Sequence, residues 1–138
     1  MKLASLLLVA VCASAQAESP VESALRNYGV VVAGTYLGMH CKWLPDLQEA
    51  EAMGNIEVLT KALSVELKST DVVLMSHNAA INFAQKENFH SCGDEAKKLA
   101  SAGIEYGRAW GNQVRAAYRP PQQAPTTTST TSATTESK

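Results

Sequence analysis

Apolar residues recur at helical spacing through the middle of the chain, and no stretch shows the sustained two-residue alternation that is typical of a strand. Ser19 and Glu22 form a predicted capping box, and Pro20 occupies the first helical position. These three residues predict the start of the first helix. It is expected to run to about Trp43 and to end before Pro45.

The second predicted helix starts at Asp46, and Glu49 follows three residues later. Gly54 and Asn55 are weak helix formers in its middle, and they leave open whether the helix breaks there. The apolar residues of this helix keep helical spacing across that point: Met53, Ile56, Leu59, Leu63 and Leu67.

A third, shorter helix is predicted after Ser69, Thr70 and Asp71, which are favourable residues at a helix start. Its pattern fades near residues 86–88, where charged and polar side chains follow one another. The residues at helical spacing in this segment are Val73, Leu74, His77, Ile81 and Ala84.

Ser91 is the predicted cap of a fourth helix. Asp94 and Glu95 lie in its first turn and Arg115 lies near its end, which is the charge distribution that the helix dipole favours. The prolines that begin at Pro120 end it. Four helices without a strand pattern predict an all-α fold.

The first residues of the chain have the pattern of a secretory signal peptide. An early lysine, the apolar run 6–11 and the small residues Ala15 and Ala17 predict cleavage after Ala17, so that residues 1–17 are removed. The run is too short for a bilayer core, which needs about 20 residues, so we expect no transmembrane segment in the mature chain. Lipidation at Cys12 is disfavoured because a valine, not a small residue, precedes it. The protein is expected to be periplasmic or secreted.

The chain carries 12 Lys and Arg against 13 Asp and Glu, and removal of residues 1–17 takes one lysine and no acid, which leaves 11 minus 13, or −2. This balance gives no reason to expect nucleic acid or an anionic membrane as a partner. Residues 119–138 are rich in Thr, Ser and Pro and hold no large apolar side chain, so they predict a disordered tail. Residues 18–118 remain as one helical domain.

Cys41 and Cys92 are the two cysteines left after cleavage, and such a pair in an oxidising compartment predicts a disulfide. In an up-down-up-down bundle, the end of the first helix and the start of the fourth lie at the same pole, where these two cysteines occur. We therefore predict a small up-down-up-down four-helix bundle that is pinned by one disulfide and followed by a disordered Thr/Ser-rich C-terminal tail.

Glycines predict close packing of the first and fourth helices. Gly34 and Leu99 each lie seven residues from the predicted disulfide (41 minus 34 and 99 minus 92), hence about 10 Å along their helices. We expect Leu99 to pack into the notch at Gly34, and Val30 to pack against Gly103 one turn later.

Aromatic residues lie at helical spacing on the first and fourth predicted helices. Such stripes mostly pack into a core. They also allow a ligand cavity between helices, in which tyrosine hydroxyls would orient a bound apolar molecule. The candidate cavity residues are Tyr28, Tyr36, Tyr106 and Trp110.

Histidines offer a second candidate site. His40 precedes Cys41 and His90 lies two residues before Cys92, so the disulfide would bring both imidazoles to one pole, near Met39. Imidazole and thioether ligands suit copper, and a reduced cysteine-histidine set would instead offer zinc ligands. The simpler interpretation is a pair of partly exposed histidines without a shared ligand, because two histidines alone rarely complete a site. We expect no cofactor.

No Gly-x-Ser-x-Gly, His-Glu-x-x-His or Cys-x-x-Cys motif and no paired-carboxylate pattern is present, so we expect no enzyme. The acids lie mainly at helix starts and near lysines, which capping and solubility explain. The sequence favours an exported, periplasmic, non-catalytic helical interaction or accessory module that binds a protein partner outside the cytoplasm. The alternative is a small-ligand or copper-like metal-binding protein that uses the bundle interior or the His40/His90 pole.

Overall fold

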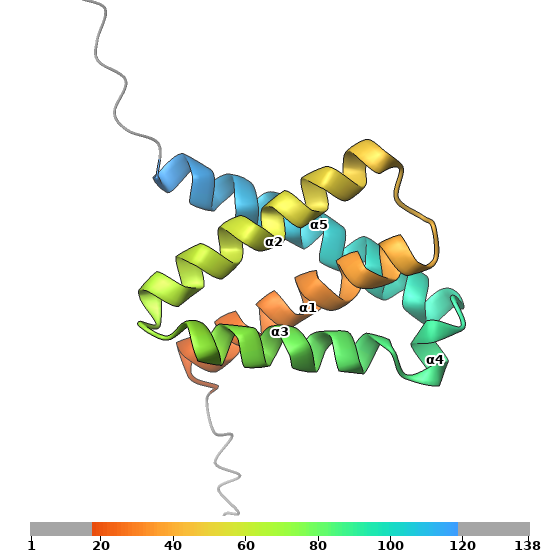
Figure 1. Cartoon of the computed structure of the whole chain (residues 1–138), viewed down its shortest axis with the longest axis horizontal. Helices are drawn as coiled ribbons and strands as arrows, with labels where there is room; N and C mark the ends of the chain where they lie inside the picture. The colour runs from red at the N-terminus through yellow and green to blue at the C-terminus, as the bar shows by residue number, and fades with distance from the viewer. Residues whose placement is uncertain (1–17, 119–138) are drawn as a thin grey trace, which may run out of the picture.

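The computed structural model describes residues 18–118, and the predicted signal peptide and tail lie outside the described residues. This part of the chain holds five helices and no strand, which confirms the all-helical prediction (Figure 1). Four of the helices are long, and the other is a single turn. Their bounds are α1 Pro20–His40, α2 Asp46–Glu66, α3 Thr70–Ala84, α4 Glu87–His90 and α5 Asp94–Ala117.

The first helix begins where the capping box predicts. Ser19 Oγ accepts a hydrogen bond from the backbone N–H of Glu22 at 3.1 Å, and the Ser19 N–H donates to Glu22 Oε2 at 3.0 Å. The helix ends at His40, earlier than the expected Trp43. It stops because Lys42 adopts a φ of 58°, a left-handed conformation in which an α-helix cannot continue.

The second helix runs unbroken through Gly54 and Asn55. Asn55 is buried, and its Oδ1 accepts a hydrogen bond from Arg115 Nη1 of α5 at 2.7 Å. The amide oxygen is therefore satisfied inside the α2–α5 contact, and the helix has no need to open for it. Met53, which shares the apolar spacing of this helix, is instead 48% exposed.

The segment before α5 differs from the expectation. Ser91 does not cap α5 but ends α4, a single turn that the sequence pattern does not predict. Cys92 then adopts a φ of 61°, which separates the two helices. Gly93 is the N-cap residue of α5, and the helix starts at Asp94.

Successive long helices run in alternating directions (Figure 1). α1 packs most extensively against α5 and next most against α3, while α2 packs against both α5 and α3. The consecutive helices α1 and α2 make the least extensive of these contacts. They therefore lie across the group of helices from each other, whereas consecutive helices are neighbours in a simple up-down-up-down bundle.

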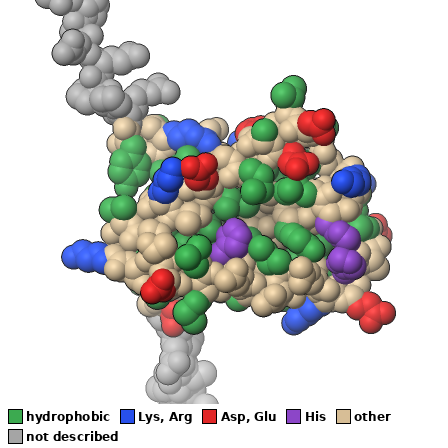
Figure 2. Space-filling model, in the orientation of Figure 1, with side chains coloured by type: hydrophobic (Ala, Val, Ile, Leu, Met, Phe, Trp, Pro, Cys, Tyr) green, Lys and Arg blue, Asp and Glu red, His purple; other side chains and the backbone are tan. Residues whose placement is uncertain are grey.

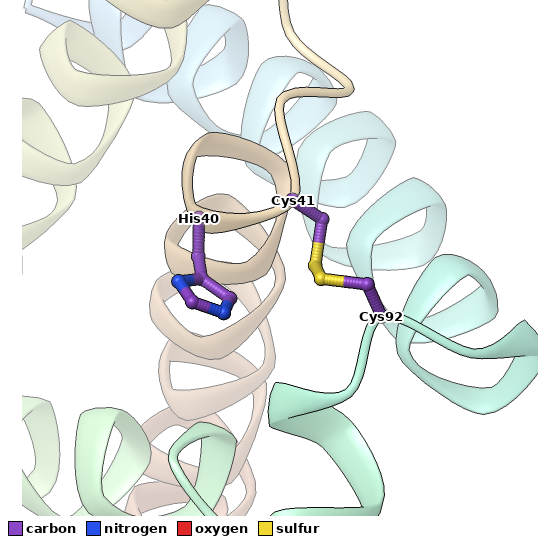
Figure 3. Close-up of side chains that lie close together, drawn as sticks. All are labelled: His40, Cys41 and Cys92. Carbon is purple, nitrogen blue, oxygen red and sulfur yellow. A yellow bond between two sulfur atoms is a disulfide. The ribbon is translucent and has the colours of Figure 1, made fainter.

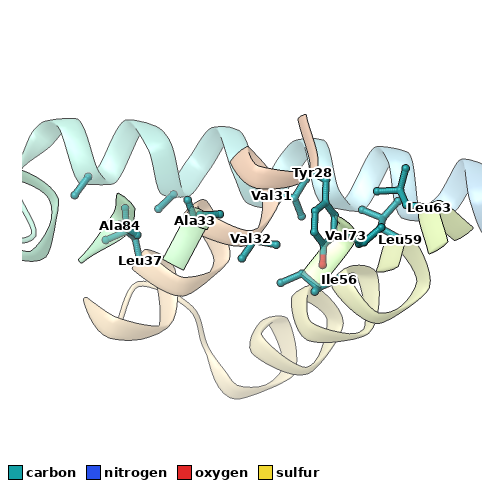
Figure 4. Packing of buried hydrophobic residues seen from close by; sticks show 13 residues of the cluster. Tyr28, Val31, Val32, Ala33, Leu37, Ile56, Leu59, Leu63, Val73 and Ala84 are labelled. Atoms are coloured by element: carbon teal, nitrogen blue, oxygen red, sulfur yellow. The ribbon is translucent and has the colours of Figure 1, made fainter. Parts of the chain in front are cut away.

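The core surrounds α1, in which residues 31–35 are all buried. α5 contributes the small side chains of Ala96 and Ala100 to the same cluster, so it approaches α1 closely. Among residues 18–118, no helix combines the length and the apolar character that a membrane span requires. The largest fully buried side chains of the core are Tyr28, Leu37, Leu59 and Leu63 (Figure 4).

The predicted close packing of α1 and α5 is present, but its detail is different. A Cβ atom built on Gly34 would lie 2.7 Å from the Cα of Gly103 and 2.6 Å from the carbonyl oxygen of Leu99. A Cβ atom on Gly103 would meet the carbonyl oxygen of Val30. The expected leucine-into-glycine contact is therefore wrong, because the two backbones already touch and leave no space for a side chain between them.

Candidate functional site

An apolar groove of about 560 Å³ lies along α1 and α3, with one side chain from α5 at its edge. It exists because α3 and α5 both pack on α1 but make little contact with each other. Gly29 of α1 belongs to the lining but adds no side chain to it. The apolar lining residues are Leu25, Val30 and Ala33 of α1, Val72, Met75, Ala79, Ala80 and Phe83 of α3, and Leu99 of α5.

The polar groups of the groove already have partners within the chain. Ser76 Oγ donates a hydrogen bond to the carbonyl oxygen of Leu25 at 3.2 Å, and Arg26 Nη2 lies 2.6 Å from Glu18 Oε2. The α3 wall of the groove is also free of acidic and basic side chains, because residues 72–85 include no Asp, Glu, Lys or Arg. This site can therefore bury apolar surface, but it offers few free groups for hydrogen bonding.

Large apolar side chains stand exposed along this wall. Met75 is 71% exposed, and Val72 and Phe83 are 41% and 42% exposed. Single exposed apolar residues are ordinary, but several on one helix beside an apolar groove form a continuous patch. A smaller hollow of about 380 Å³ between α2 and α5 has two cationic residues in its lining, Lys61 and Arg115, whereas the groove has one, Arg26.

A chain of hydrogen bonds joins α1, α2 and α3 beneath the surface. The Tyr28 hydroxyl lies 2.7 Å from Thr60 Oγ1 and 2.9 Å from His77 Nδ1, and Thr60 Oγ1 donates to the carbonyl oxygen of Ile56 at 2.7 Å. Because the Thr60 proton is used on Ile56, the Tyr28 O–H donates to Thr60, and His77 Nδ1–H donates to Tyr28. This chain positions the three helices around the core.

Burial shifts the pKa values of Tyr28 and His77, the two titratable residues of this chain of hydrogen bonds, in opposite directions. It raises the pKa of the Tyr28 phenol and lowers the pKa of the His77 imidazole, because each shift favours the uncharged form. On the face shown in Figure 2, hydrophobic and histidine side chains occupy the centre, and charged side chains lie mainly around it. The neutral forms of Tyr28 and His77 suit their buried and partly buried positions.

Cys41 and Cys92 form the expected disulfide, with Cα atoms 5.7 Å apart (Figure 3). The bond joins the end of α1 to the residue before the α5 cap, so it brings the two predicted histidines to the same pole. The rings of His40 and His90 stack with centroids 3.9 Å apart and planes inclined by 25°. His40 Nε2 also lies 3.1 Å from the carbonyl oxygen of His90.

This pole brings together potential metal ligands, but it does not aim them at one ion. The ligand atoms of His40, Cys41 and Cys92 lie within 4.8 Å of one another, yet the two sulfur atoms are bonded to each other and are not free thiolates. The lone pairs of an imidazole lie in its ring plane, so nearly parallel stacked rings cannot both point at a metal between them. Met39, the third predicted ligand, is partly buried in the last turn of α1.

The four candidate cavity residues lie in three separate settings. Tyr28 is fully buried in the core, whereas Tyr36 stacks on His40 with centroids 6.0 Å apart. Tyr106 lies beside Trp110 on α5, with ring centroids 5.7 Å apart, and is 42% exposed. The structure therefore does not bring these aromatic residues together around one ligand.

The groove was not predicted from the sequence, although one signal for it is present. Residues 72–85 form an uncharged helical stretch with apolar residues on more than one face, whereas α2 and α5 carry charges along their length and the uncharged stretch of α1 is mostly buried. A helix that is apolar on a face beyond its core stripe needs a second contact surface. This pattern could have identified α3 as a binding element.

No protein-family model matches the chain, and comparisons with curated proteins and with solved structures find no match.

Proposed function

We propose that this protein is an exported, non-catalytic interaction module: four long helices, bundled and pinned by one disulfide, that bind an apolar helical segment in the groove between α1 and α3. The observation that carries this proposal is the groove itself. Its lining is almost wholly apolar, its polar groups are already paired, and large side chains of α3 stand exposed beside it.

The chemistry of the groove favours a helix over an extended peptide. An extended strand would bring its own backbone N–H and C=O groups into a site that has few free partners for them. A helix satisfies these groups internally and presents only side chains. The wall formed by the 15 residues of α3 is about 22 Å long, which accommodates about four turns of a bound helix.

Export is supported by the signal-peptide pattern of residues 1–17 and by the disulfide between Cys41 and Cys92. Disulfides persist mainly outside the reducing cytosol. A periplasmic or secreted location fits both features.

Photo-crosslinking in the native compartment tests the groove. Benzoylphenylalanine replaces Phe83, an aromatic side chain of the groove wall, and a matched variant carries it in place of Glu57, an exposed residue of α2 outside the groove lining. Illumination is expected to yield a discrete covalent protein product from the Phe83 position and none at comparable yield from the Glu57 position. Mass spectrometry then identifies both linked chains and the linked segment.

Equal, diffuse labelling from both positions would contradict the proposal, because it would show that the groove has no preferred partner. Recovery of a small apolar molecule in the groove, with no linked protein, would support the small-ligand alternative instead. The intact mass of the isolated protein separates these outcomes, since a bound molecule or a linked chain each adds a distinct mass.

A further inference from the structure

We infer that the helix that fills this groove belongs to a second copy of the same chain, and that the two α3 helices pack antiparallel about a two-fold axis at Ala79. This inference rests on the proposed function, because it names the partner of the same groove. Four residues that line the groove carry it, and they are named here the α3 stripe: Val72, Met75, Ala79 and Phe83.

The α3 stripe lies on one face of the helix, because its members are spaced by three, four and four residues. Ala79 stands in the middle with a small side chain, and the larger Met75 and Phe83 stand on either side of it at equal distances along the chain. A small residue at the centre allows two helices to approach closely, and large residues beside it fill the space around the contact.

The spacing makes the stripe complementary to itself. About a two-fold axis at Ala79, Met75 of one copy faces Phe83 of the other, since each lies four residues from the axis. A thioether beside an aromatic ring is a favourable contact, and the symmetry forms it twice. Met75, which is 71% exposed in one copy, would extend into the groove of the other.

Charged residues flank the stripe at both ends. Lys68 and Asp71 precede the uncharged stretch and Lys86 and Glu87 follow it, so each end carries one positive and one negative side chain. In the antiparallel register Asp71 of one copy lies opposite Glu87 and beside Lys86 of the other, so charge does not select the direction, and the Met75–Phe83 contact does. Lys86 Nζ already lies 5.0 Å from the centre of the Phe83 ring, on the side of the stripe.

The terminal segments of the chain are poorer occupants. Residues 119–138 hold no large apolar side chain, so they cannot bury apolar surface in the groove. The apolar run at residues 6–11 is expected to leave with the signal peptide. A second copy supplies an apolar helix of matching length without either segment.

Sedimentation velocity of the full chain, with its disulfide intact, tests the inference over a range of concentrations. We expect a monomer–dimer equilibrium, and Met75→Asp should weaken it by about a hundredfold because it buries an unpaired charge in the contact. Leu74→Asp is the matched control: Leu74 is 46% exposed on the same helix but lies off the stripe. This control should leave the dimer unchanged, and circular dichroism confirms that both variants fold.

A mixing experiment tests the two-fold geometry. Met75→Asp and Phe83→Lys variants should each be monomeric alone, because each homodimer sets a charge against an apolar residue twice. Mixed together, they should form a heterodimer, in which one contact pairs Asp with Lys and the other keeps the native Met75 and Phe83. Restored association of the mixture is specific to the antiparallel register, and a structural defect of either variant would not produce it.

A wild-type chain that stays monomeric up to about 100 μM, a concentration that detects micromolar dimers, would overturn the inference. A dimer that Leu74→Asp disrupts and Met75→Asp does not would overturn it as well. If the chain is monomeric while the crosslinker at position 83 captures a different protein, the proposed function stands and only the identity of the partner is wrong. If the chain is monomeric and nothing is captured, both fail.

Discussion

Gly34 of α1 and Gly103 of α5 lie back to back, so that the two helices touch through their main chains. A Cβ atom on Gly34 would lie 2.7 Å from the Cα of Gly103, a separation that real Cβ atoms do not adopt. This contact holds α5 close against one side of α1, while α3 packs on another side. The floor of the apolar groove is the surface of α1 that remains between them.

Gly103→Ala should destabilise the fold by about 1–3 kcal/mol or more, because the added methyl group meets backbone atoms that cannot move separately from their helix. Chemical unfolding measures this. Gly54→Ala is the control: its Cβ would lie 3.8 Å from Arg115 Nη2, an ordinary contact, so it should stabilise α2 by up to about 1 kcal/mol. Equal effects of the two substitutions would show that the helix contact is looser than described.

Tyr28→Phe should cost about 1–3 kcal/mol, since it leaves Thr60 and His77 without their buried partner. Tyr36→Phe provides a comparison, because the Tyr36 hydroxyl accepts one exposed hydrogen bond from Gln85 at 3.3 Å. Its effect on the free energy of unfolding should be within about 0.5 kcal/mol. A Tyr28 effect as small as that of Tyr36 would mean that the buried hydrogen bonds contribute little.

Stability should fall as the pH decreases below about 6.5, the ordinary pKa of histidine, because burial lowers the pKa of folded His77. In this range the unfolded chain binds the proton more readily than the folded chain. The contribution of His77 to the free energy of unfolding is therefore fully present above the pKa that this residue has in the unfolded chain. It is lost as the pH falls through the lower pKa that His77 has in the folded chain. Urea unfolding across this range should show a smaller decrease for His77→Gln, and identical decreases would exclude His77 as the cause.

The protein isolated from its native compartment should have an intact mass that begins at Glu18, and it should show no free thiol before reduction. Reduction and alkylation should then lower the free energy of unfolding by about 4 kcal/mol, because the disulfide closes a loop of 51 residues in the unfolded chain. Two thiols that react before reduction would contradict the disulfide-pinned fold and would make the cysteine-histidine pole a candidate metal or redox site.

Local signals in the sequence predicted the helices well where capping chemistry is explicit. The Ser19–Glu22 capping box and the Ser69 cap both form as expected, and the helical order brings Cys41 and Cys92 together. The caps depend on residues a few positions apart in the sequence. The disulfide depends on which ends of the helices lie at the same pole, and the alternating direction of the helices defines that.

Features that depend on contacts between distant residues were not predictable in the same way. Asn55 resembles a helix breaker in isolation, but Arg115 of a different helix satisfies its side chain. Gly34 was expected to accept a leucine, because spacing gives the level of a residue along a helix and not the distance between two backbones. The groove likewise depends on α3 and α5 packing on separate sides of α1.

Two native methionines allow the most direct test of the groove. Met75 of the α3 stripe is 71% exposed in a single copy, and Met53 of α2, outside the groove lining, is 48% exposed. Both can be oxidised briefly in the native compartment and on the dilute purified chain, and the ratio of Met75 to Met53 oxidation can be compared. This ratio should fall several-fold in the native compartment, because a bound helix covers Met75. An unchanged ratio would show that the groove is empty where the protein works, and it would contradict the central claim.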